Sequence, residues 1–376
     1  MKIIVAGDFV PNGRVAENIN NNQSFIDDKV VDILRRADYS IVNLEAPVVM
    51  SAHAMPIEKV GPNLYCTENS LDSLIAAGFT CVTLANNHFR DYGDFGVKDT
   101  LSVCQNKGID SVGGGVDFEE ASAILYKQIG GKTLSVINCC EHEFSIASET
   151  LPGSNPLNTV KQYYQILEAK RKSDYVLVIV HGGHEKCQYP SLRMQETYRF
   201  FIDIGADAVV NHHQHCYSGY ETYKDKPIFY GLGNFCFDSF CNVYGENWHY
   251  GYLLELEFND DTDHISFDLY PYTQCIDTPE VKLIEERSAF DSHISQINSV
   301  INDREQLMRK LSEFYLLSTN QIETILEPRR ARSFMRFFIR GKMPRFLLNW
   351  RRKYQLINMI ECESHRDRLL YILKIM

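Results

Sequence analysis

The chain has 376 residues, of which 44% are hydrophobic and 23% charged, which is ordinary for a soluble globular protein. Its length allows one large α/β domain with an appendage, or two modest domains. It contains no uninterrupted apolar run of about 18 residues and no recognisable signal peptide, so we expect neither a transmembrane helix nor export. The 11 cysteines, an odd number without a CxxC pair, indicate reduced thiols in a cytoplasmic protein.

In chain order, the first 275 residues alternate apolar strand patterns with amphipathic helix patterns. We predict strands at 2–8, 39–45, 79–88, 121–129, 132–140, 174–183, 206–215, 227–235 and 251–258. Helices are predicted at 27–37, 70–78, 97–108, 159–172 and 193–205, and a loop at 145–158. Repeated strand–helix units favour an α/β fold, while hairpins near 120–140 and 250–272 indicate that the sheets are mixed.

The C-terminal part of the chain differs in character. Beyond residue 285 strand patterns fade and helical periodicity dominates, so we place a boundary that gives domains 1–278 and 279–376. Residues 329–376 carry 13 Lys and Arg against 3 Asp and Glu, and 329–360 contain no acidic residue at all. An acidic body with a basic, aromatic-rich tail has three interpretations: a helical appendage packed on the body, an interfacial helix on an anionic membrane, or nucleic-acid binding, which no motif supports.

Polar side chains capable of binding metal follow most of the predicted strands. Because ligands bind beyond the carboxyl ends of strands in α/β sheets, we expect these residues to meet at one edge. They are Asp8, Asn43, Glu45, Asn87, His88, His181, Glu185, His213, His215 and Asn234.

This set contains carboxylate, amide and imidazole groups but no thiolate. Such ligands suit Mn²⁺, Zn²⁺ or Fe²⁺, and the set is large enough for one or two ions. Each member also has a purely structural interpretation: Asp8 as a helix cap, Glu45 as a loop residue, His181 as a core histidine. The run of histidines at 212–215 is harder to explain without a metal, although His212 should point away from its neighbours.

The motifs GDFVPNGR, NLEAPV, LANNHFRDYG, HGGHE, VVNHHQH and YGLGNF resemble those of the CapA family of poly-γ-glutamate capsule synthesis proteins. That family is similar in fold to the calcineurin-like metallophosphatases, which implies a four-layer αββα sandwich of mixed sheets over residues 1–275, with a C-terminal helical appendage outside the resemblance. The resemblance implies metal ligands at Asp8, Glu45 (bridging), Asn87, His181, His213 and His215. It also implies that His88 protonates the leaving group, and it leaves Glu185 as a metal ligand, a residue that supports the ligands, or a substrate group.

One position departs from the metallophosphatase pattern. A histidine usually stands two residues after the first aspartate, and here that residue is Val10. One of two metal ions is therefore expected to be weakly held, unless Glu185 compensates. Arg14 and Arg90, near Asp8 and His88 in sequence, are candidates to hold an anionic small-molecule or polymer substrate, or are ordinary surface residues.

These observations lead to three functional hypotheses. The first is a metal-dependent phosphoesterase linked to capsule or cell-surface polymer biosynthesis. The second is an amide-bond hydrolase or transferase acting on a polyglutamate-like polymer. The third is a non-catalytic capsule assembly factor. We expect a cytoplasmic location, with peripheral contact to the inner face of an anionic membrane through residues 329–360.

Overall fold

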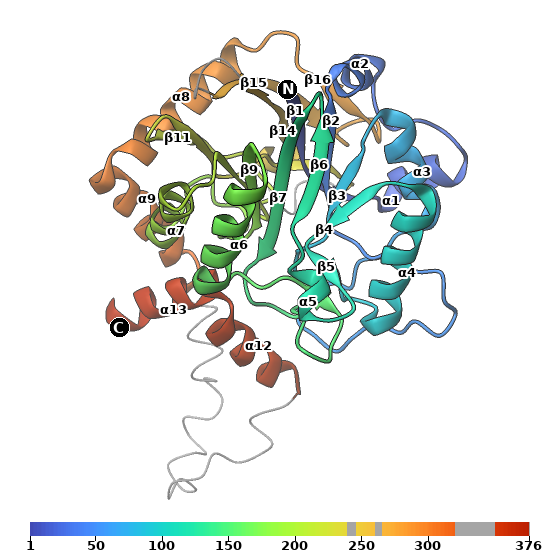
Figure 1. Cartoon of the computed structure of the whole chain (residues 1–376). Helices are drawn as coiled ribbons and strands as arrows, with labels where there is room; N and C mark the ends of the chain where they lie inside the picture. Colours follow the sequence, from blue (N-terminus) through green and yellow to red (C-terminus); the bar gives the residue numbers. More distant parts are fainter. Residues whose placement is uncertain (239–245, 260–264, 320–349, 376) are drawn as a thin grey trace, which may run out of the picture.

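Two β-sheets packed face to face form the centre of the molecule (Figure 1). The computed structural model describes residues 1–238, 246–259, 265–319 and 350–375. The large sheet has the order β16-β15-β14-β1-β2-β3-β4, with β13 also paired to β1. Strands β1 to β4 are parallel, whereas β14, β15 and β16 are antiparallel. The strands are β1 (Lys2–Val10), β2 (Tyr39–Leu44), β3 (Cys81–Thr83), β4 (Asp110–Val112), β13 (Asn234–Phe237), β14 (Tyr250–Phe258), β15 (Ile265–Gln274) and β16 (Val281–Leu283).

The second sheet has the order β11-β12-β10-β9-β7-β6. Its central strands β7, β9, β10 and β12 run parallel, and β6 and β11 are antiparallel edges. The strands are β6 (Leu125–Ile129), β7 (Lys132–Cys140), β9 (Tyr175–His181), β10 (Ala208–His212), β11 (Tyr220–Tyr223) and β12 (Lys226–Phe229). A two-stranded ribbon pairs β5 (Gly114–Gly115) with β8 (Gly153–Ser154), and β8 lies in the predicted 145–158 loop.

Helices cover the outer face of each sheet and complete four layers (Figure 1). Alternation along β1 shows the layering: Ile3 and Val5 belong to the core shared with the second sheet, while Ile4 and Ala6 pack with the helices. On the large sheet these helices are α1 (Gly13–Asn20), α2 (Asp28–Arg36), α3 (Glu68–Ala77) and α4 (Gly93–Lys107), and on the second sheet α6 (Thr159–Lys172) and α7 (Leu192–Asp203); α5 (Phe118–Ala121) is a single turn. The αββα sandwich and both predicted hairpins are thus confirmed.

The C-terminal region is helical and packs against the sandwich. Helix α8 (Ser288–Asn302) contributes Phe290, Ile294 and Ile297 to the main core, and α9 (Arg304–Leu316) follows it. Helices α12 (Trp350–Glu361) and α13 (Glu363–Ile375) lie at the end of the sandwich where β7 ends (Figure 1). The last strand of the large sheet, β16, begins after residue 278, so the sheet extends beyond the boundary drawn from the sequence.

Most of the basic segment 329–360 lies outside the described residues, and only its last part is seen, as α12. Its proposed contact with a membrane surface stays a prediction. Among the helices that the structure describes, each is too short or too polar to cross a bilayer. Helix α1 has no counterpart in the sequence prediction, and strand β3 covers only three residues of the predicted 79–88, because the chain leaves the sheet after Thr83.

Candidate metal centre

The first ligand position is created by an irregularity in strand β1. The pairing of β1 with both β2 and β13 shifts register at Asp8, as in a β-bulge, and a bulge re-aims a side chain. Gly7 permits this, because a Cβ atom there would lie 1.8 Å from the carbonyl oxygen of Gly233. The Asp8 carboxylate, 1% exposed, accepts hydrogen bonds from the Asn43 amide (2.7 Å) and the His213 backbone N–H (3.2 Å).

Three buried histidines face this carboxylate from the second sheet. His181 is the last residue of β9, and His213 and His215 follow the end of β10. Both His213 (φ 90°) and His215 (φ 55°) have left-handed backbone conformations, which cost non-glycine residues about 1–3 kcal/mol each. Backbone strain of this kind at two neighbouring histidines is typical of a functional site. His212 bonds instead to the Ala6 carbonyl (3.1 Å), as its predicted orientation required.

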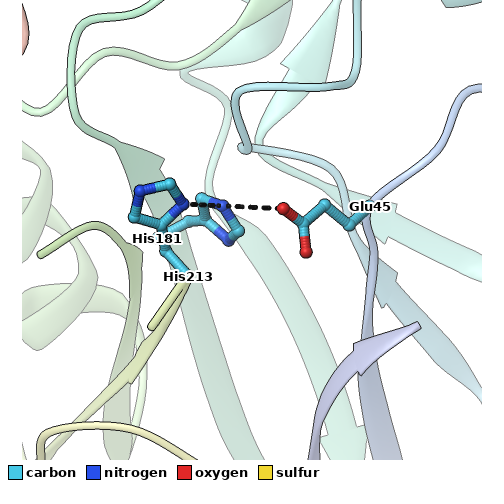
Figure 2. Close-up of side chains that lie close together, drawn as sticks. All are labelled: Glu45, His181 and His213. Atoms are coloured by element: carbon cyan, nitrogen blue, oxygen red, sulfur yellow. Dashed lines mark hydrogen bonds and ion pairs between the residues drawn. The ribbon is translucent and has the colours of Figure 1, made fainter. Parts of the chain in front are cut away.

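Glu45 supplies the observation that tests whether a metal fits. Its side chain is fully buried, and neither carboxylate oxygen has a hydrogen-bond partner among the described residues. Oε1 lies 3.4 Å from Nε2 of His181 and 3.6 Å from Nε2 of His215, and Figure 2 shows His181 and His213 facing it. A buried carboxylate costs several kcal/mol unless it is paired or binds a cation. Its surroundings, imidazoles that can act as ligands, fit a divalent ion.

The protonation tendencies of Glu45, His181 and His213 agree with this interpretation, whereas, against the lowering effect of burial, the charges of Glu45 and Asp8 raise the pKa of His215 to about 10 while no cation is present. Burial, and secondarily the charge of Asp8, raise the pKa of Glu45 to about 7 in the absence of a cation. Burial lowers the pKa of His181 to about 3 and that of His213 to about 4, so both imidazoles are neutral at physiological pH. Neutral imidazole is the form that binds metal.

The donor atoms fall into overlapping triads whose members lie within 4.8 Å of one another. Asp8, Glu45 and His215 form one triad, and Glu45, His181 and His213 form a second. Glu45 belongs to both triads, which is compatible with the bridging position that the resemblance implies for it. Glu185 joins a third triad with His213 and His215. Asn87 brings its Oδ1 atom to 3.0 Å from Nε2 of His181.

Val10, buried and apolar, adds nothing to this centre. Two amides that we predicted as possible metal or substrate ligands hold other residues of the cluster in position. Asn43 donates to Asp8 (2.7 Å), lies 3.2 Å from Nδ1 of His181, and accepts from the Thr83 hydroxyl (3.2 Å). Asn234 holds His215 through a 2.9 Å contact between its Oδ1 atom and Nδ1. Both belong to the layer around the ligands, which fixes ring orientation and tautomer.

His88 lies beside the triads and is held by residues that the sequence reasoning missed. Nδ1 of His88 lies 2.6 Å from Oδ2 of Asp91 and 3.1 Å from Nζ of Lys59. Lys59 and Asp91 also form an ion pair with each other, and both are almost fully buried. Asp91 stands three residues after His88 in a motif already singled out, which was an available signal. Lys59 comes from the loop before α3, and no motif or strand pattern in the sequence pointed to it.

The two arginines expected near a substrate are bound elsewhere. Arg14 donates from Nη2 to Asp238 (2.8 Å) and to the Cys275 carbonyl (3.0 Å), so its guanidinium anchors the segment after β15. Arg90 pairs with Asp94 (2.8 Å) in the first turn of α4. The contacts of Arg14 and Arg90 therefore do not support a role in substrate binding.

Glu143 is a further residue missed from the sequence. Its Oε1 atom lies 3.8 Å from Nε2 of His213, and burial together with the charge of Glu185 raises its pKa to about 8. It follows strand β7 by three residues, so the rule that found the other ligands applied to it as well.

Comparison with known proteins identifies the family of the chain. Residues 2–239 match the family model described as bacterial capsule synthesis protein PGA_cap. Over 247 residues the chain is 32% identical to the capsule biosynthesis protein CapA of Bacillus anthracis, covering 63% of this chain and 60% of that protein. It is 33% identical over 231 residues to the PGA biosynthesis protein CapA of Bacillus subtilis, covering 60% of each. The matches therefore span less than two thirds of these relatives.

A looser likeness, with a TM-score of 0.46 and 16% identity, links 76% of the chain to 95% of a crystal structure described as a novel phosphatase from Mycoplasma pneumoniae. The family assignment rests on the match over residues 2–239, which contains each member of the metal triads around Glu45. The chain belongs to the PGA_cap family of bacterial capsule synthesis proteins.

Proposed function

We propose that this protein is a metal-dependent hydrolase of the phosphoester type that acts in the assembly of a bacterial capsule or related cell-surface polymer. The observation that supports it most directly is the buried Glu45 carboxylate, which accepts no hydrogen bond from the rest of the described protein and faces His181, His213 and His215. Two triads sharing one carboxylate suit a pair of divalent ions. The family of the chain and the names of its relatives support the link to capsule formation.

The residues of the chain divide the chemical tasks among them. Asp8, Glu45, Asn87, His181, His213 and His215 would hold the ions, with Asn43 and Asn234 fixing their orientation. Divalent ions bound there would supply Lewis acidity and lower the pKa of water. Because the carboxylates neutralise only part of the ionic charge, the occupied centre attracts an anionic substrate such as a phosphoester.

His88 is suited to protonate the leaving group. Its Nδ1 atom is engaged by Asp91 and Lys59, so Nε2 is the ring nitrogen left to carry a proton to a departing oxygen. Its side chain is 10% exposed, which leaves it accessible at the rim of the centre. Asp91, held by its ion pair with Lys59, fixes the ring as the carboxylate does in other His–Asp pairs.

The test combines metal analysis with turnover. Protein stripped by a chelator would be reloaded with Mn²⁺, Zn²⁺ or Fe²⁺ and assayed on a phosphomonoester, a phosphodiester and a γ-glutamyl amide. We expect metal-dependent turnover of a phosphoester, and loss of both bound metal and turnover in Glu45→Gln. Turnover of the amide alone would favour the amide-bond hydrolase instead. Full metal occupancy without any turnover, or no bound metal, would favour a non-catalytic assembly role.

A further inference from the structure

The elbow between the last two helices contacts the end of strand β7. Cys362 joins α12 to α13 and is 1% exposed. Its Sγ atom lies 3.8 Å from Oε1 of Glu143 and 3.7 Å from Oε2 of Glu141. His365, in the first turn of α13, completes a group with Cys362 and Glu143 in which the possible ligand atoms all lie within 4.8 Å of one another. Glu143 is 219 residues from Cys362 in sequence, so the fold has brought its carboxylate to the thiol and the imidazole of the elbow.

We propose that Glu143, Cys362 and His365 bind a thiophilic divalent cation, Zn²⁺ being the best match, at a site separate from the Glu45 triads. A tetrahedral zinc site with usual bond lengths separates a sulfur from a carboxylate oxygen by about 3.6 Å, close to the 3.8 Å observed here. Thiolate, imidazole and carboxylate are all zinc ligands, and three protein ligands leave a fourth position open. Among the described residues, no other candidate metal group contains a thiol.

The elbow is held in place by contacts that do not involve the three ligands. Arg193 of α7 bonds Glu141 (2.6 Å), the Ser364 hydroxyl (3.1 Å) and Asp367 (2.8 Å). The Ser364 N–H donates to Glu141 (3.0 Å), and His142 bonds Glu363 through its backbone and its ring. The ring of His365, in contrast, has no hydrogen bond to another described residue. A preorganised elbow reduces the entropy that a cation must overcome to order its ligands.

The site adjoins the main centre, because the oxygen of Glu143 that faces Cys362 also lies 3.8 Å from Nε2 of His213. A cation here would couple the C-terminal helices to the histidines of the main centre through one carboxylate. Cys362 and His365 lie beyond residues 2–239, so two of the three ligands come from outside the segment that defines the family. Burial raises the pKa of the Cys362 thiol, so the binding cation displaces the thiol proton to solvent.

Cobalt spectroscopy separates this site from the main centre, whose ligand set contains no thiolate. The chelator-stripped full chain would be titrated with Co²⁺, following the near-ultraviolet thiolate-to-cobalt charge-transfer band together with bound metal. We expect the band in the wild type and in Cys104→Ser, which removes a buried thiol of α4 that belongs to no candidate ligand group of the described residues. We expect it to vanish in Cys362→Ser, with one equivalent of bound metal lost.

A second variant keeps the proposal testable if Cys362→Ser fails to fold. His365→Gln keeps the thiol and its contacts but removes the imidazole. The Co²⁺ affinity reported by the band should fall by more than about tenfold, because mutating residues that only orient metal ligands already costs about 10–100-fold in affinity. A wild-type protein that binds Co²⁺ without the band overturns the proposal, as does a band that persists in Cys362→Ser. In both cases the equivalents of Co²⁺ that bind without the thiolate band still report the occupancy of the main centre.

Discussion

The side-chain oxygen of Asn234 lies 2.9 Å from Nδ1 of His215. The amide orientation is fixed, because its Nδ2 atom donates to the carbonyl oxygens of His215 (3.2 Å) and Trp248 (3.3 Å). Only an acceptor then faces Nδ1, so Nδ1 carries a proton and Nε2, on the side of Glu45, is the nitrogen left to bind a cation. The tautomer of a predicted ligand is therefore set from strand β13.

Replacing Asn234 with alanine should weaken metal binding without removing a ligand. Loss of such an orienting partner typically costs about 10–100-fold in metal affinity. Competition with a chelating dye would measure the change. Asn155→Ala is a matched control, since Asn155 is equally buried but its amide donates only to the Asn138 carbonyl among the described residues. That variant should lose stability while keeping its metal affinity. Equal affinities in Asn234→Ala and the wild type would show that the amide does not tune His215.

His88→Gln should lower kcat while leaving bound metal unchanged. A positioned general acid contributes about 10²–10⁴-fold to a rate, so a fall of this size is expected on the phosphoester identified by the panel. The limb of the pH–rate profile that reports the acid should vanish as well. His53→Gln, which changes an exposed histidine, should behave as the wild type. Wild-type kcat in His88→Gln would remove His88 from the proposed mechanism.

How far the sequence predicts the centre depends on whether a residue follows an apolar strand. Asp8, His181, His213 and His215 could be found because each stands near the carboxyl end of an apolar strand, where the ends of parallel strands meet at one sheet edge. Glu143 obeys the same rule after β7 but was not singled out. Lys59 could not be predicted, because its contact with His88 depends on the course of an irregular loop.

The fold itself was predictable for related reasons. Period-two and period-3.6 patterns report which face of an element is buried, so most main strands and helices were predicted. The exceptions are large: β3 is three residues long, and the predicted strand 227–235 is divided between β12 and β13 in different sheets. What no local pattern reports is how distant elements meet. Cys362 and His365 lie in a helical region with no motif, so the sequence did not indicate that they meet Glu143. Arg14 was a candidate to bind substrate, but its guanidinium binds Asp238 and the Cys275 carbonyl.

Docking of helix α8 should weaken as the pH falls below about 6.5. His293 of α8 contacts the Tyr217 hydroxyl, and partial burial lowers its pKa below the ordinary value of 6.5. A histidine whose pKa is lower in the folded than in the unfolded protein binds fewer protons in the folded state. Its contribution to the free energy of unfolding is therefore complete above the unfolded pKa and is lost as the pH falls through the folded pKa. Thermal unfolding of the wild type and His293→Gln between pH 8 and pH 5 tests this. The variant should show a smaller fall in Tm; parallel profiles would contradict the assignment.

Arg193→Leu should release helix α13 from the sandwich. Arg193 makes charged hydrogen bonds to Glu141 and Asp367, and both carboxylates lose their partner in the variant. We expect a local loss on the order of 2–3 kcal/mol, since one member of each pair is left behind. Hydrogen exchange of residues 363–375 should then accelerate by about one to two orders of magnitude.

The control for this change lies on the same helix. Arg199, also on α7, binds Glu221 in a similar two-bond geometry (2.9 and 2.5 Å), but Glu221 belongs to β11 and not to the C-terminal elbow. Arg199→Leu should therefore destabilise the protein without accelerating exchange in residues 363–375. If both variants accelerate exchange equally, the elbow is held by the overall stability of the sandwich and not by Arg193. If only Arg193→Leu does so, the contacts of Arg193 are what hold helix α13 beside the metal centre.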